Sequence, residues 1–232
     1  PPMRRVVLVH SLSLALALPL LLPAAVLDFV QAFARGPSFL DGPNAVALSP
    51  DGEFAYFAAS ATDAVVIFGR DATTGMLNYL DAAREGIAGA DGLVGARDVV
   101  VSPDGAYLYV AGAGENAVAV FARDAATGAL TFVAKEGDGA AGFDGLAAVS
   151  ALALSPDGAH LYSASPGDDA VAVFVRDPGT GSLAFVEVER DGIAGVDGLN
   201  GARALVVSPA PGSHLYVASD VDDAVAVFAR NP

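Results

Sequence analysis

Four polar residues recur every 53 residues along the chain, and together they could bind an anion. Each stands five residues before a Ser-Pro pair, at the start of a short apolar run: Asn44, Arg97, Ser150 and Arg203. Guanidinium groups hold carboxylates or phosphates through paired, charge-assisted hydrogen bonds. We therefore predict a site for a small anionic ligand at these positions. The alternative is that the two arginines pair with loop acids such as Asp91 and Asp197.

Acidic residues recur with the same spacing in glycine-rich segments. Asp91, Asp144 and Asp197 each precede a glycine and follow a second acid by six residues. Carboxylate oxygens on such turns suit a hard cation such as Ca²⁺, although the spacing is not that of an EF-hand. The alternative, which we favour, is that these acids are turn residues copied by duplication. No other cofactor is predicted.

The sequence names no catalytic group directly. It contains no Cys, which excludes disulfides and cysteine-ligated metals, and its three histidines form no cluster of metal-ligand spacing. No Ser/His/Asp arrangement is visible either. His160 and His214 occupy the position held by Phe54 and Tyr107 in other repeats, so we expect half-buried aromatic roles for them.

These residues belong to a repeat that predicts the fold. Ser-Pro-Asp-Gly begins at Ser49, Ser102 and Ser155, and a variant, Ser-Pro-Ala-Pro-Gly, begins at Ser208. Around each copy lie short apolar runs bounded by Gly, Pro and Asp, which indicate four β-strands per unit. Four strands in about 50 residues is the blade of a β-propeller. We predict an all-β propeller domain over residues 26–232, with four four-stranded antiparallel blades whose first strands surround a channel.

The fourth unit stops before its own outer strand, and the sequence suggests where that strand comes from. Residues 27–30 read Leu-Asp-Phe-Val, which repeats the pattern of the outer strand. We predict that residues 26–30 complete the last blade and so protect its edges. Two alternatives remain: this stretch is the tail of an apolar N-terminal segment, or the chain is a fragment of a larger ring.

The N-terminus and the net charge bear on location and partners. Met3-Arg4-Arg5 precedes an apolar run over residues 6–26, so residues 1–25 are predicted to be a signal peptide or a membrane anchor. A secreted or periplasmic protein is expected, with a membrane-anchored one as the alternative. The net charge of −15 argues against nucleic acid as a partner and against membrane contact except through this segment. The expected partner is a small anion or another protein.

The repeat resembles a known group of bacterial proteins. Ser-Pro-Asp-Gly together with Tyr-Leu-Tyr-Val-Ala at residues 107–111 and Leu-Tyr-Val-Ala at 215–218 is similar to the repeat of YVTN-type and lactonase-like β-propellers. The resemblance implies a propeller, usually of seven blades. It also implies hydrolysis of a sugar lactone or cyclic ester as an alternative to our main prediction, an exported module that binds a ligand or protein. A carboxylate or histidine reaching the channel beside Arg97 or Arg203 would favour the enzyme.

Overall fold

The repeat folds into fifteen β-strands, and the described residues include no helix. The computed structural model describes residues 29–32, 39–140 and 142–231. The first blade contains β1 (Pro43–Leu48), β2 (Phe54–Ala59), β3 (Ala64–Arg70) and β4 (Leu77–Arg84). The second contains β5 (Ala96–Val101), β6 (Tyr107–Gly112), β7 (Ala117–Arg123) and β8 (Leu130–Gly137). The third contains β9 (Ala151–Leu154), β10 (His160–Ser165), β11 (Ala170–Arg176) and β12 (Leu183–Arg190), and the fourth contains β13 (Ala202–Val207), β14 (His214–Ser219) and β15 (Ala224–Ala229).

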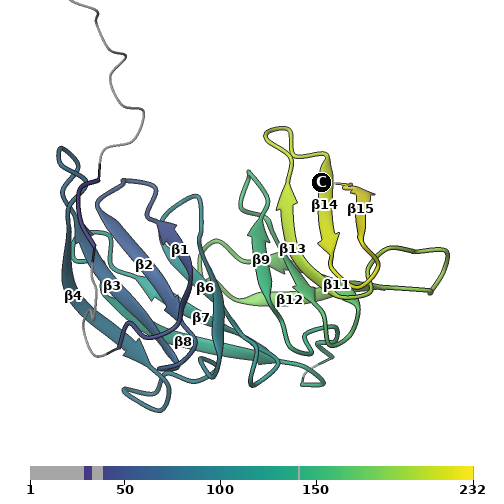
Figure 1. The fold of residues 1–232 in the computed structure, drawn as a ribbon, viewed down its shortest axis with the longest axis horizontal. Coiled ribbons are helices and arrows are strands. Elements are labelled where there is room, and N and C mark those ends of the chain that lie inside the picture. Colours follow the sequence, from purple (N-terminus) through teal and green to yellow (C-terminus); the bar gives the residue numbers. More distant parts are fainter. Residues whose placement is uncertain (1–28, 33–38, 141, 232) are drawn as a thin grey trace, which may run out of the picture.

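Each blade is an antiparallel sheet whose strands follow chain order, as predicted for a propeller. The first strands of the blades, β1, β5, β9 and β13, line an open axial cavity of about 540 Å³. Consecutive blades pack face to face, and Figure 1 shows them following one another from the first blade (purple and blue) to the fourth (yellow). The four-blade propeller architecture predicted from the 53-residue period is therefore confirmed.

Burial explains why the middle strands are apolar throughout. Strand β7 reads Ala-Val-Ala-Val-Phe-Ala-Arg and is buried along almost its whole length, because it lies between two neighbouring blades. The outer strand β8 alternates between exposed and partly buried residues, the pattern of a sheet with one solvated face. Three clusters of buried side chains join the blades in sequence, one for each pair of consecutive blades.

A buried arginine fastens each blade to the one before it. Arg176 donates from Nε to the hydroxyl of Tyr109 at 2.9 Å and from Nη2 to Asp104 at 2.5 Å, and both partners lie in the second blade. Burial raises the pKa of Tyr109 to about 12, so its hydroxyl stays protonated and donates to Gly181 O at 2.9 Å. Arg123 contacts the first blade in the same way. These repeated arginines are therefore structural, and the acids that pair with Arg123 and Arg176 come from the preceding blade.

The predicted closing strand is wrong. The fourth sheet has three strands, and residues 29–32 form no strand. Gln31 instead exchanges side-chain hydrogen bonds with the backbone of Leu77 in β4, at the outer edge of the first blade. Phe29 is 84% exposed, whereas the corresponding aromatic residue of the first outer strand, Tyr79, is 40% exposed. The rest of the predicted strand, residues 26–28, lies outside the described residues.

The predicted signal peptide or anchor, residues 1–25, also lies outside the described residues. Within the described ranges, no helix has the length and apolar character needed to span a bilayer.

Candidate ligand-binding site at the channel mouth

The inner strands of three blades begin with a β-bulge, and the bulged residues are predicted ligand-binding residues. The strand register shifts between Pro43 and Ala45, between Ala96 and Asp98, and between Ala202 and Ala204. The residues in these shifts are Asn44, Arg97 and Arg203. A bulge leaves one residue unpaired and redirects its side chain. Ser150 takes the same position in the third blade, immediately before β9.

Three of the four predicted residues line one pocket. Arg97, Ser150 and Arg203, from three consecutive blades, border a cavity of about 280 Å³ together with residues of the neighbouring loops. Asn44 is not among its lining residues. Its side-chain amide donates to the backbone oxygen of Ala96 at 3.4 Å, which directs it toward the second blade. The prediction thus selected residues that meet in space, and whether they bind an anion stays a prediction.

The two arginines of this pocket differ in how their charge is balanced. Arg203 forms an ion pair with Asp220, and both side chains are about half exposed. Arg97 is exposed and forms no hydrogen bond or ion pair with any residue that the structure describes. Neither arginine pairs with Asp91 or Asp197, the loop acids expected as alternative partners. The Arg97 guanidinium therefore remains exposed, and ligand binding through it stays a prediction.

A carboxylate that sequence reasoning missed follows Arg97 directly. Asp98 lies in β5 and lines the axial cavity, whereas the equivalent residues of the other blades are Ala45, Ala151 and Ala204. Its oxygens accept hydrogen bonds from the backbone N–H of Leu152 at 2.7 Å and of Val99 at 2.8 Å. The signal that could have found it was present in the sequence: one repeat carries an acid where three carry alanine.

The environment of Asp98 favours its protonated form more than water would. Burial raises the pKa of Asp98, and the hydrogen bonds from the Leu152 and Val99 amides only partly oppose this effect. A carboxylate with a raised pKa is better matched to accepting and returning a proton than an exposed one. Asp98 and Arg97 thus place a proton acceptor in the channel and a cation at its mouth on adjacent residues of one strand.

The predicted calcium residues each lie in an acidic cluster. In each cluster the carboxylate oxygens lie within 4.8 Å of one another: Glu85, Asp91 and Glu115; Asp138, Asp144 and Asp168; and Asp191, Asp197 and Asp222. Basic side chains neutralise two of them. Lys135 contacts Asp91 at 2.7 Å, and Arg190 contacts Asp144 at 2.5 Å. Among the described residues, the third cluster has no such cation.

The first acid of each cluster holds its own loop together. Glu85, Asp138 and Asp191 each accept a hydrogen bond from the backbone N–H eight residues later, at 2.7, 3.1 and 3.0 Å. Burial raises the pKa of Glu85, and the charges of Glu115 and Asp91 add to that rise against the hydrogen bond from Leu93. These contacts support the interpretation of the acids as turn residues. Calcium binding through Asp91, Asp144 and Asp197 stays a prediction.

The comparisons with known proteins agree with this architecture. A search of the curated proteins finds no match. Among solved structures, the periplasmic gluconolactonase PpgL of Pseudomonas aeruginosa is 29% identical, with a TM-score of 0.65, over 82% of this chain and 50% of that one. A candidate 6-phosphogluconolactonase of Bacteroides uniformis is 24% identical, with a TM-score of 0.66, over the same shares of the two chains.

The matches cover only part of each solved structure. This chain spans about half the length of these two structures, 50% in each case. Hydrazine synthase of Kuenenia stuttgartiensis, 24% identical with a TM-score of 0.59 over 82% of this chain and 46% of that one, shares the fold as well, so the fold alone does not select an activity. The family model described as lactonase, 7-bladed beta-propeller matches residues 89–232, more than half of the sequence. This chain therefore belongs to the lactonase family of seven-bladed β-propellers.

Proposed function

We propose that this chain carries the substrate site of a lactonase-type propeller, which hydrolyses a sugar lactone or a related cyclic ester. The observation that carries the proposal is the position of Asp98, a carboxylate lining the axial cavity directly after the unpaired Arg97. Family membership and the likeness to a gluconolactonase support the same activity. This lactone hydrolase is the alternative function that the sequence resemblance implied.

Asp98 suits the proton transfers of the hydrolysis. Each carboxylate oxygen of Asp98 accepts one backbone hydrogen bond, which leaves lone-pair capacity to take a proton from an attacking water. That water oxygen adds to the lactone carbonyl carbon, and the ring C–O bond then breaks. The proton held by Asp98 passes to the departing ring oxygen, so a hydroxy acid leaves and the carboxylate is restored.

The arginines suit the product and the charged part of the substrate. Arg97 presents planar, two-pronged donors at the channel mouth, and Ser150 lies between it and Arg203 in the same pocket. The Ser150 Oγ lies 3.1 Å from the backbone oxygen of Arg203 and 3.3 Å from that of Ala164, and it can donate to either. A carboxylate or phosphate on the sugar would pair with Arg97, while the ester group reaches toward Asp98.

A second candidate function is binding without turnover, the main prediction from the sequence. It is favoured by the mostly apolar lining of the axial cavity, where valine and leucine from all four inner strands surround Asp98. Export through residues 1–25 belongs to both proposals and is supported by the periplasmic location in the name of the Pseudomonas relative. In this second case a small acid, or a protein that presents one, occupies the pocket of Arg97, Ser150 and Arg203.

Acid release from glucono-δ-lactone, corrected for spontaneous hydrolysis, separates the two candidates. We expect Asp98→Asn to lower kcat about 10²- to 10⁴-fold, the usual contribution of general acid–base catalysis. Arg97→Ala should chiefly raise KM. Asn44→Ala, at the equivalent bulge but outside the pocket, is the matched control and should leave both unchanged. If wild-type protein binds gluconate by calorimetry but releases no acid above background, the hydrolase proposal is wrong and the binding module stands.

A further inference from the structure

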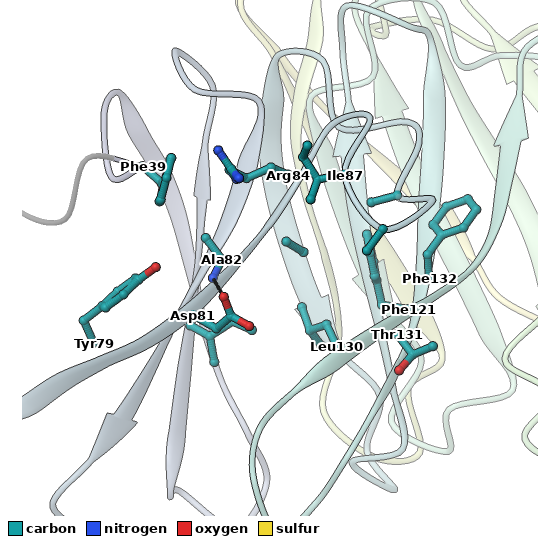
Figure 2. A pocket seen from close by; sticks show the side chains of 14 residues that line it. Phe39, Tyr79, Asp81, Ala82, Arg84, Ile87, Phe121, Leu130, Thr131 and Phe132 are labelled. Atoms are coloured by element: carbon teal, nitrogen blue, oxygen red, sulfur yellow. Dashed lines mark hydrogen bonds between the residues drawn. The ribbon is translucent and has the colours of Figure 1, made fainter.

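A second cavity lies away from the channel, between the first two blades. Its volume is about 410 Å³, within the roughly 300–1,000 Å³ range of small-molecule sites. Figure 2 shows Tyr79 and Asp81 on the side of the first blade and Phe121 and Phe132 across from them, with Arg84 at one end. Because its walls come from β4, β8 and the loop between β4 and β5, it lies near the outer strands rather than the axis.

The repeat explains why this cavity exists. Ala90 in its wall has equivalents 53 residues apart, Phe143 and Val196. Phe143 is buried between the second and third blades, where its ring stacks on Phe174 at 5.6 Å and 21°. It also lies 6.4 Å from the ring of Phe185. One aromatic ring thus fills the later junction.

The junction between the first and second blades has the same two aromatic neighbours but lacks the ring equivalent to Phe143. Phe121 and Phe132 are the equivalents of Phe174 and Phe185, and their rings meet edge to face at 5.7 Å. Both line the cavity beside the methyl group of Ala90. The chain itself therefore shows what fits there: a planar ring in the position that Phe143 takes one blade later.

A cation stands at the same cavity. The Arg84 guanidinium lies over the ring of Phe39, 4.2 Å from its centroid, and its N–H groups have no carboxylate or hydrogen-bond partner among the described residues. The acid of this wall, Asp81, accepts a hydrogen bond from the N–H of Ala82 at 2.8 Å. Stacking fixes the plane of the guanidinium while its donors remain available to an anion.

We propose that this cavity binds a small aromatic carboxylate. The ring takes the place equivalent to Phe143, against Phe121 and Phe132, and the carboxylate pairs with Arg84. Apolar slots lined by aromatic groups accept planar rings because stacked and edge contacts add to area burial. The site is separate from Arg97 and Asp98, so it stands whether or not the channel hydrolyses lactones.

Calorimetry on the full chain tests the proposal with benzoate and 1-naphthoate as probes. Both should bind, and cyclohexanecarboxylate, which has the charge but no planar ring, should bind at least about tenfold more weakly. Ala90→Phe fills the slot and should abolish binding while the protein remains folded. Arg84→Met should weaken the carboxylates and leave toluene binding unchanged. Undiminished binding to Ala90→Phe, or no binding of either aromatic acid to the wild type at millimolar concentration, would overturn the proposal.

The later junction supplies a reciprocal test. Phe143→Ala should open a matching slot between the second and third blades and lower Tm. Toluene should then raise Tm of this variant more than that of the wild type, because it replaces the missing ring. If Phe143→Ala does not fold, Phe143→Val copies the residue of the third junction and serves in its place. A variant whose Tm does not respond to toluene would contradict the idea that the slot accepts a free ring.

Discussion

The junction between the second and third blades differs from that between the third and fourth, although both use the same residue types. Arg176 has partners for Nε, Nη1 and Nη2, and the third of these is the carboxylate of Asp104. Arg230 donates from Nε to Tyr162 and from Nη1 to Gly212, but its Nη2 is buried and has no partner in the part of the chain that the structure describes. The last junction therefore lacks the ion pair of the others.

The sequence offers a physical reason for the difference. The glycine that accepts from Nη1 ends a turn of one more residue in the fourth repeat, Ser-Pro-Ala-Pro-Gly in place of Ser-Pro-Asp-Gly. Asp157, the equivalent of Asp104, accepts hydrogen bonds from the Ser155 hydroxyl and from the N–H of Ala159, and it forms no ion pair with Arg230. The outward side of this blade is also exposed: Val225 is 67% exposed, whereas its equivalents in the earlier blades, Val65, Val118 and Val171, are buried. Satisfied buried donors, rather than residue type, distinguish a strong junction from a weak one.

The largest expected effect comes from removing the arginines themselves. Arg176→Ala should lower the free energy of unfolding by about 2–4 kcal/mol, because charge-assisted hydrogen bonds across a buried junction are lost. Arg230→Ala should cost about half as much, since one of its donors is already without a partner. Arg70→Ala, in the first blade, has a single hydrogen bond to Gly52 and should cost under about 1 kcal/mol. Urea denaturation gives all three values, and equal losses would refute the comparison.

The second-largest effect is expected from acid, which should weaken the junctions that contain an arginine–aspartate ion pair. Burial raises the pKa of Asp51, but hydrogen bonds from Ser49, Glu53 and Arg123 outweigh it and lower the pKa from 3.8 to about 2. A folded-state pKa below the unfolded one means that this stabilisation is fully present above about pH 4 and is lost as the pH falls through 2. Asp51→Asn should remove part of the decline in stability between pH 4 and pH 2. Denaturation midpoints across that interval provide the measurement, and parallel curves for variant and wild type would contradict it.

The smallest effect concerns carboxylates that cap the next blade. Asp169 accepts a hydrogen bond from Gly201 N at 2.8 Å, whereas its equivalent in the last blade, Asp223, accepts none from the described residues. Both have a φ of 50°, so replacement by alanine strains both backbones alike. Asp169→Ala should therefore cost about 0.5–1.5 kcal/mol more than Asp223→Ala, the value of one hydrogen bond. Indistinguishable melting curves for the two variants would show that the cap contributes nothing.

The sequence predicted the blades because their signals are local and repeated. Strands, turns and bulged positions recur every 53 residues, so Arg97, Ser150 and Arg203 could be placed together before any coordinates. The closing strand could not be predicted, since an apolar pattern does not say which edge it meets, and Gln31 joins the first blade. Asp98 was not predicted because the candidate residues were chosen by their repeated positions, whereas Asp98 stands where the other three repeats have alanine.

Hydrogen-bond partners were the other part beyond prediction. The acids of the loops were found from the sequence, but not that Lys135 and Arg190 neutralise two of their clusters, because these cations come from the outer strands. Asn44 failed as a pocket residue for a similar reason: its amide is drawn to the backbone of Ala96. Which partner each side chain contacts depends on distances of a few ångströms between blades, and the sequence period does not determine these distances.

The constant spacing of the arginine contacts has a consequence for how the chain folds. Arg123 and Arg176 each reach a tyrosine 67 residues earlier and an aspartate 72 residues earlier. The loop-closure entropy of docking a blade is therefore the same for each, because it depends on the logarithm of the loop length. Every newly formed blade meets a finished surface one repeat behind it, so contact order relative to length falls as blades are added. A chain of this design can fold in the order in which it is synthesised, with each blade serving as the template for the next.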